Sequence, residues 1–230
     1  METWVGEKTA LDARVASLIA DHLRATLRAR PRAVLGLVGG RSVGGIHAEL
    51  ARQDLPWERL HVFLADERLV PVTSEDSNYR LVHADLLAGL VASGRFPEAN
   101  AHACTPDPAD PRPGIEAYGR DLDALGGRFD VALLSAGEDG HCASLFPCHA
   151  SVSDEGEHFL LVEASPKPPP RRVSASRRLL ERSGLGVVVF YGESKRDALA
   201  LFRDPSVDVQ GCPSKLVAKI DPSYLVTDLA

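Results

Sequence analysis

The sequence has no apolar run that approaches the roughly 20 residues a membrane-spanning helix needs. Its first residues, METWVGEKTALDARVASLIADHLRATL, also lack the charged, apolar and small-residue regions of a signal peptide. These absences indicate a cytoplasmic protein with no membrane partner.

Cysteine is scarce and basic residues are not in excess. The four cysteines (Cys104, Cys142, Cys148 and Cys212) are irregularly spaced, and none of the spacings is typical of zinc. We expect reduced thiols that pack as small apolar residues, and no metal. The net charge of -6 argues against nucleic acid as a partner, although an acidic chain can bind an acidic substrate where cations gather in one pocket.

The composition favours a substantial core. Hydrophobic residues make up 44% of the 230 residues and charged residues 25%, which is typical of a folded protein and not of a disordered one. No internal repeat is present, and we expect one domain over residues 1–230.

Short apolar runs alternate with amphipathic segments. Helices are predicted at 11–27, 46–50, 77–90 (with Ser77 as N-cap), 115–125 and 195–202. Strands are predicted at 33–38, 60–64, 129–134, 159–162, 173–175, 186–191 and 224–226, and 101–114 is expected to be an exposed loop. This alternation predicts an α/β fold with a mostly parallel sheet, which binds ligands beyond the carboxyl ends of its strands.

The first predicted strand is followed by the glycine-rich segment VGGRSVGG at 38–45. Gly39 and Gly40 precede Arg41, Ser42 and a predicted helix, so free backbone N–H groups and a cation would meet at one place. The segment matches neither a P-loop nor the GxGxxG pattern. It predicts either an anion-binding loop or a tight turn without a ligand.

Charged residues follow two further strands. Asp66, Glu67 and Arg68 could supply an acid, a base, a metal ligand or an anion contact, or could form a solvated loop. The segment SAGEDGHCASLFP at 135–147 combines glycines with Glu138, Asp139 and His141. Histidine accepts a proton near neutral pH, and either neighbouring acid could orient its ring.

Two later segments add cations. Lys167, Arg171 and Arg172 flank a run of prolines, and Lys195 lies between a predicted strand and a predicted helix. Each of them either reaches a pocket at a strand end or is solvated surface charge.

Seven sequence blocks resemble motifs of the 6-phosphogluconolactonase family in their residues and in their order along the chain. They are GGRS at 39–42, DER at 66–68, DSNYR at 76–80, GEDGH at 137–141, SLFP at 144–147, PKPPPRR at 166–172 and GESK at 192–195. The chain departs from the family at Val43, where proline is more frequent, and at Cys142, where threonine is more frequent. The resemblance implies a Rossmann-like sheet with helices on both faces, similar to the glucosamine-6-phosphate deaminase/ribose-5-phosphate isomerase-like fold.

The resemblance further implies hydrolysis of 6-phospho-D-glucono-1,5-lactone in the oxidative pentose phosphate pathway, with no cofactor. His141 would activate water, with Arg68 or loop N–H groups stabilising the oxyanion and Asp66 shaping the site. The phosphate would be held by Gly39, Gly40, Arg41 and Ser42, with Arg172 and Lys195 as cationic partners. The expected partner is a phosphosugar lactone, and the protein would be a monomer or a small homo-oligomer.

Three other functions are compatible with the same residues. A glucosamine-6-phosphate deaminase would use the acid at Asp66 to abstract a proton, a sugar-phosphate sensor would bind without turnover, and a metal-dependent hydrolase would lose activity in chelator. The DER, DSNYR and PKPPP blocks favour the lactonase.

Overall fold

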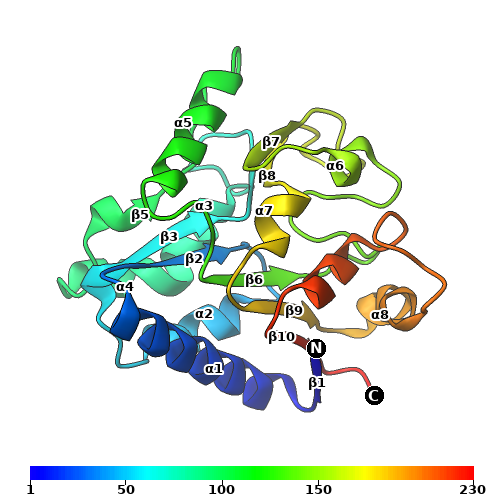
Figure 1. The fold of residues 1–230 in the computed structure, drawn as a ribbon, viewed down its shortest axis with the longest axis horizontal. Coiled ribbons are helices and arrows are strands. Elements are labelled where there is room, and N and C mark those ends of the chain that lie inside the picture. Colours follow the sequence, from blue (N-terminus) through cyan, green and yellow to red (C-terminus); the bar gives the residue numbers. More distant parts are fainter.

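The computed structural model describes all 230 residues and contains a seven-stranded parallel sheet (Figure 1). Its strands lie in the order β1 (Glu2–Val5), β10 (Ser223–Thr227), β9 (Gly186–Phe190), β6 (Val131–Ser135), β2 (Ala33–Leu37), β3 (Leu60–Leu64) and β5 (Ala101–His102). The predicted α/β fold with a mostly parallel sheet is therefore confirmed.

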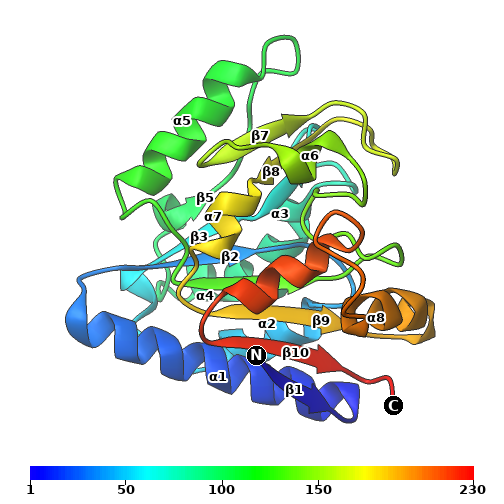
Figure 2. The same ribbon diagram turned by 45° about the vertical axis from the view of Figure 1, so that its right-hand side comes forward.

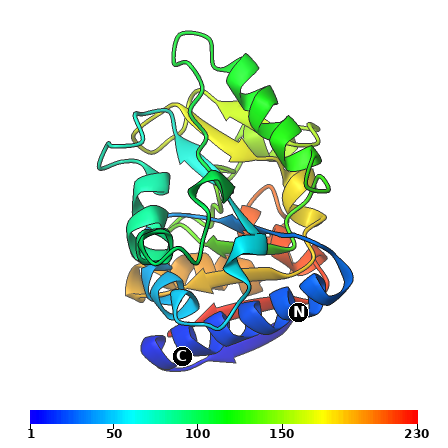
Figure 3. The ribbon, with the colours of Figure 1, turned by 90° about the vertical axis from the view of Figure 1, so that its left-hand side faces the viewer.

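The helices cover both faces of this sheet because the crossover direction changes along the chain. The connections from β1 to β5 run one way along the strand order, and those from β5 to β10 run the other way. Right-handed crossovers therefore place the two sets on opposite faces, as Figures 2 and 3 show. The first set is α1 (Lys8–Ala29), α2 (Gly44–Ala51), α3 (Asn78–Val82) and α4 (Ala88–Ala92); the second is α5 (Arg112–Asp123), α7 (Arg177–Glu181), α8 (Arg196–Arg203) and the 3-10 helix η5 (Pro213–Lys219).

A small antiparallel sheet lies beyond the main one and consists of β4 (Asp66–Arg68), β8 (Arg172–Ala175) and β7 (Phe159–Val162). The sequence predicted strands at 159–162 and 173–175 but did not separate them from the parallel sheet. Only a loop joins β7 to β8, and a parallel pair would need a longer crossover connection, so the two strands pair antiparallel.

The strands of the main sheet could be predicted from the sequence because they are buried. β2, β3 and β9 are buried at every position, because helices cover both faces and the strands consequently read as continuous apolar runs. One cluster of 65 buried apolar residues joins these strands to the helices, so the strand ends share a common packed support. None of the helices combines the length and apolarity needed to cross a membrane.

Several elements differ from the prediction. The expected helix over 77–90 is divided into α3, a π-helical turn (His83–Leu87) and α4, although Ser77 caps it as predicted, accepting from the N–H of Arg80. The expected loop at 101–114 begins with β5 and ends inside α5. β1, α6 (Ala150–Ser153), α7 and η5 were not predicted, because they are short or only partly apolar.

His47 makes stability depend on pH. It lies in α2, is 1% exposed, and neither ring nitrogen has a hydrogen-bond partner. Burial lowers the pKa of His47 to about 4, below the value of about 6.5 for an unfolded chain. The folded state therefore binds fewer protons, and stability falls as the pH drops from about 6.5 towards 4.

We expect His47→Leu to reduce this acid sensitivity by about 2 kcal/mol at pH 5 relative to pH 7, because the leucine has no proton to take up on unfolding. Urea unfolding at the two pH values measures the difference. The partly exposed His83 provides the control, as His83→Leu should leave most of the pH dependence in place. An equally steep loss in His47→Leu would contradict the assignment.

Candidate active site

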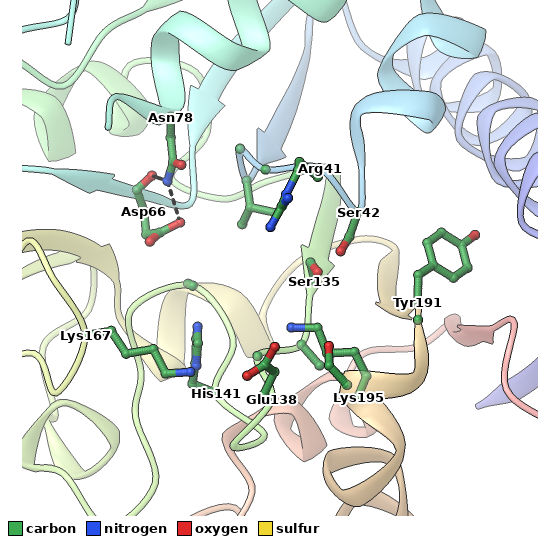
Figure 4. Close-up of a pocket in the computed structure, with 18 of the residues that line it drawn as sticks. Arg41, Ser42, Asp66, Asn78, Ser135, Glu138, His141, Lys167, Tyr191 and Lys195 are labelled. Atoms are coloured by element: carbon green, nitrogen blue, oxygen red, sulfur yellow. Dashed lines mark hydrogen bonds between the residues drawn. The ribbon is translucent and has the colours of Figure 1, made fainter. Parts of the chain in front are cut away.

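The candidate site lies where the sheet changes its crossover direction. β2 and β6 are neighbours, but the chain leaves β2 towards one face and β6 towards the other. This divergence opens a crevice at the carboxyl ends of the two strands, the usual ligand site of such a sheet. A cavity of about 690 Å³ occupies it and is lined mainly by polar residues (Figure 4).

The loop after β2 forms one wall of the cavity. Gly40 has a φ of 115°, a conformation that favours glycine, and a Cβ on Gly39 would lie 2.5 Å from the side-chain oxygen of Asn78. Arg41 and Ser42 line the cavity. The N-terminus of α2 has no side-chain cap, so the first N–H groups of that helix have no side-chain acceptor.

The loop after β6 holds the histidine. Asp139 Oδ1 lies 2.5 Å from His141 Nδ1, and the N–H of His141 donates to the same oxygen at 3.2 Å. A donor at Nδ1 leaves Nε2 as the acceptor, and the ring projects into the cavity in Figure 4. Burial alone would raise the pKa of Asp139, but the hydrogen bond to His141 and the charges of His141 and Lys167 hold it well below its usual range.

The structure thus brings Asp139, and not Glu138, into contact with the imidazole. A Cβ on Gly137 would lie 2.0 Å from His141 Nδ1, so only glycine lets the ring fold back over the loop. Glu138 is exposed and lies beside Lys195 in Figure 4. Burial lowers the pKa of Lys195, and the charge of Glu138 opposes that shift.

Strand β4 carries the DER residues, and buried Glu67 fixes this segment. Its carboxylate accepts hydrogen bonds from the backbone N–H groups of Arg68, Asn78 and Tyr79 at 2.7, 2.8 and 2.8 Å. The Ser77 hydroxyl donates to it at 3.0 Å. Burial raises the pKa of Glu67, and these hydrogen bonds oppose the shift. Glu67 therefore ties β4 to the start of α3.

Asp66 and Arg68 both face the cavity from β4. Asp66 is 5% exposed and accepts from Asn78 Nδ2 at 3.1 Å and from the Ser144 hydroxyl at 2.7 Å. Arg68 donates to the side-chain oxygen of Asn78 at 2.6 Å. Asn78 consequently links the two residues, a role that the sequence did not reveal although Asn78 and Ser144 lie within the quoted DSNYR and SLFP blocks.

The proline-rich segment contributes two cations of different character. Arg172 is buried, lies 3.9 Å from Asp66, and donates to the backbone carbonyls of Lys167, Pro168 and Pro169. Burial lowers the pKa of Arg172, and Asp66 opposes this shift. Lys167 is partly exposed, with its Nζ 3.8 Å from Asp139 Oδ2. Both line the same cavity as Arg41 and Lys195.

The cysteines and the acidic residues do not assemble a metal-binding group. All four cysteines are free, and no cluster of three or more His, Cys, Asp or Glu side chains is placed to hold an ion. Cys142, next to His141, is fully buried and packs in the apolar core. Val43 is likewise buried, directly before α2.

Known proteins are similar to this chain in sequence. The sequence profile of the glucosamine-6-phosphate isomerases/6-phosphogluconolactonase family matches residues 6–226. A 6-phosphogluconolactonase from Borreliella burgdorferi is 32% identical over 192 residues, covering 84% of this chain and 81% of that protein. One from Synechocystis sp. is 32% identical over 217 residues, covering 91% and 88%.

Solved structures resemble the fold of this protein over nearly the whole chain. The 6-phosphogluconolactonase from Thermotoga maritima has a TM-score of 0.82 and 26% identity, with 98% of each chain covered. A monomeric glucosamine-6-phosphate deaminase has a TM-score of 0.81 at 17% identity, covering 99% of this chain and 97% of that one, and so shares the fold.

Replacing Glu67 by glutamine should loosen β4 and the start of α3. Glu67→Gln places an amide group where donors converge, so we expect a loss of about 1–3 kcal/mol in the free energy of unfolding. Urea unfolding measures this loss, and Glu75→Gln, in the exposed loop nearby, is the matched control. Equal stability of the two variants would contradict the anchoring role.

Proposed function

The chain belongs to the 6-phosphogluconolactonase family, and we propose that it hydrolyses 6-phospho-D-glucono-1,5-lactone to 6-phosphogluconate, a step of the oxidative pentose phosphate pathway. The observation that carries this proposal is that His141, paired with Asp139, lines the same cavity as Arg41 and Lys195. A proton acceptor and an anion-binding loop within one cavity suit a substrate with an ester at one end and a phosphate at the other.

In the proposed reaction His141 Nε2 takes a proton from water as the water oxygen attacks C1 of the lactone. The bond between C1 and the ring oxygen then breaks, and the proton on Nε2 passes to that oxygen. Asp139 holds the ring in the required tautomer and stabilises its charged form. Arg68, held by Asn78, is placed to donate to the oxyanion that forms at C1.

The phosphate would bind to Gly39, Gly40, Arg41 and Ser42, in the loop that leads into α2, and to Lys195. Arg172, expected from the sequence to be a phosphate ligand, already donates to three backbone carbonyls. We therefore propose that Arg172 supports the proline-rich segment.

The contacts of Asp66 favour lactone hydrolysis over the deaminase reaction. Each of its carboxylate oxygens accepts a hydrogen bond, from Asn78 and from Ser144, which stabilises the carboxylate anion and makes it a weaker base. We propose that Asp66 organises the site. We also propose a cytosolic location, where its free thiols stay reduced.

A coupled assay with freshly generated lactone tests the histidine pair. His141→Ala should lower kcat by about 100- to 10,000-fold while 6-phosphogluconate still binds. Asp139→Asn should cost on the order of 100-fold or more, because the amide fails to fix the tautomer. Glu138→Gln is the matched control and should lose far less. Near-normal turnover by His141→Ala, or ammonia release from glucosamine 6-phosphate, would exclude the proposed reaction.

Lys195 should make phosphate binding sensitive to alkaline pH. Burial lowers its pKa, so its charge is lost at a lower pH than for an ordinary lysine, whereas the phosphate stays dianionic. We expect the Kd of 6-phosphogluconate, measured by calorimetry from pH 7 to 10, to rise in the wild type. Lys195→Arg should flatten that rise, and Lys195→Ala should raise Kd about 10- to 100-fold at pH 7. An unchanged Kd in Lys195→Ala would remove this residue from the phosphate site.

A further inference from the structure

The cations that line the cavity lie on different elements. Arg41 lies in the glycine-rich loop and Lys195 beside Glu138, whereas Lys167 projects beside His141 (Figure 4). Six Lys or Arg residues and only three acidic residues line the whole cavity, although acidic residues predominate in the chain. The proposed phosphate contacts use Arg41 and Lys195, so Lys167 has no role in them.

The ammonium of Lys167 makes no hydrogen bond, whereas the guanidinium groups of Arg68 and Arg172 each make several, although Arg68 Nε also has no partner. Arg172 donates to backbone carbonyls, and one terminal nitrogen of Arg68 donates to Asn78 and to the Asp76 carbonyl. By contrast, the ammonium of Lys167 makes no hydrogen bond, because its nearest carboxylate oxygen, on Asp139, lies 3.8 Å away. That gap exceeds the usual hydrogen-bond distance of about 2.7–3.2 Å.

The backbone at Lys167 is nevertheless held firmly. Its N–H donates to the Ser165 hydroxyl oxygen at 3.2 Å, and its carbonyl accepts from that hydroxyl at 2.8 Å and from Arg172 at 3.2 Å. Ser165 and Arg172 are both buried. The structure therefore presents a positioned lysine whose charge faces the cavity and is not neutralised by a direct hydrogen bond.

The proposed hydrolysis creates a negative charge beside His141. The C1 carbonyl of the lactone is neutral, whereas C1 of the open-chain product is a carboxylate. A hydrogen bond from an ammonium to a carboxylate is about twice as strong as one between neutral groups. A cation beside His141 consequently favours the product over an otherwise similar ligand without the charge.

We infer that the His141 end is a second anion subsite, in which Lys167 binds the carboxylate of open-chain sugar acids phosphorylated at the other end. The inference rests on the proposed function for the orientation of the ligand. It makes Lys167 a determinant of specificity for ligands with two anionic ends, and it makes the product an inhibitor that competes with the lactone.

Two ligands that differ only at C1 test the subsite. 6-Phosphogluconate and glucitol 6-phosphate share the carbon chain and the phosphate, but the second has a neutral CH2OH group in place of the carboxylate. Calorimetry at pH 7.5 should show that the wild type binds 6-phosphogluconate about 10- to 100-fold more tightly. Lys167→Met should reduce this preference to a few-fold and leave the Kd of glucitol 6-phosphate unchanged, which also shows that the pocket remains folded.

Arg171→Met is the matched control, because Arg171 is in the same segment but contacts Pro108 and Glu163 outside the cavity. It should keep the wild-type preference. Equal binding of the two ligands by the wild type would overturn the inference. So would a Lys167→Met variant that loses affinity for both ligands alike, since that result would place Lys167 at the phosphate.

The lactone assay separates this inference from the proposed function. Hydrolysis without a preference for the carboxylate would overturn only the second anion subsite. A preference for the carboxylate without hydrolysis would support the subsite and overturn only the proposed reaction.

Discussion

The pairing of β2 with β6 is the constraint on which the site depends. The register places Leu37 beside Leu133, so the segments that follow these strands begin at the same edge of the sheet. Because the two connections leave towards opposite faces, no helix fills the space between them. The glycine-rich loop and the His141 loop consequently face one another across a cavity, although about 100 residues separate them in the sequence.

A second level of organisation comes from buried polar groups around this crevice. Glu67 accepts hydrogen bonds from four donors and so fixes the segment between β4 and α3. This segment in turn places Asn78 between Asp66 and Arg68. Such a network holds its geometry because its hydrogen bonds are strengthened inside a poorly hydrated environment. The rigidity of the site therefore depends on a residue that does not line the cavity.

The sequence predicted the parts of the molecule that local patterns encode. Continuous apolar runs revealed the buried strands, and the glycine and charged clusters after them revealed the ends at which a ligand would bind. It did not predict β4, because three polar residues form a strand only by pairing with β8. Nor did it distinguish Glu138 from Asp139 as the partner of His141, since that choice depends on the turn at Gly137 and Gly140.

The positions of the cations indicate how a ligand would be oriented in the cavity. In an acidic chain the cations that face the ligand are concentrated in one cavity, with Arg41 in the glycine-rich loop and Lys167 beside His141. Binding of the phosphate at Arg41, remote from the reacting carbon, would orient the sugar along the cavity and bring C1 to His141. The free energy of phosphate binding would thereby hold the reacting carbon in the correct position. Lys167 at that same end then binds the charge that the reaction generates, so it would slow the departure of the product.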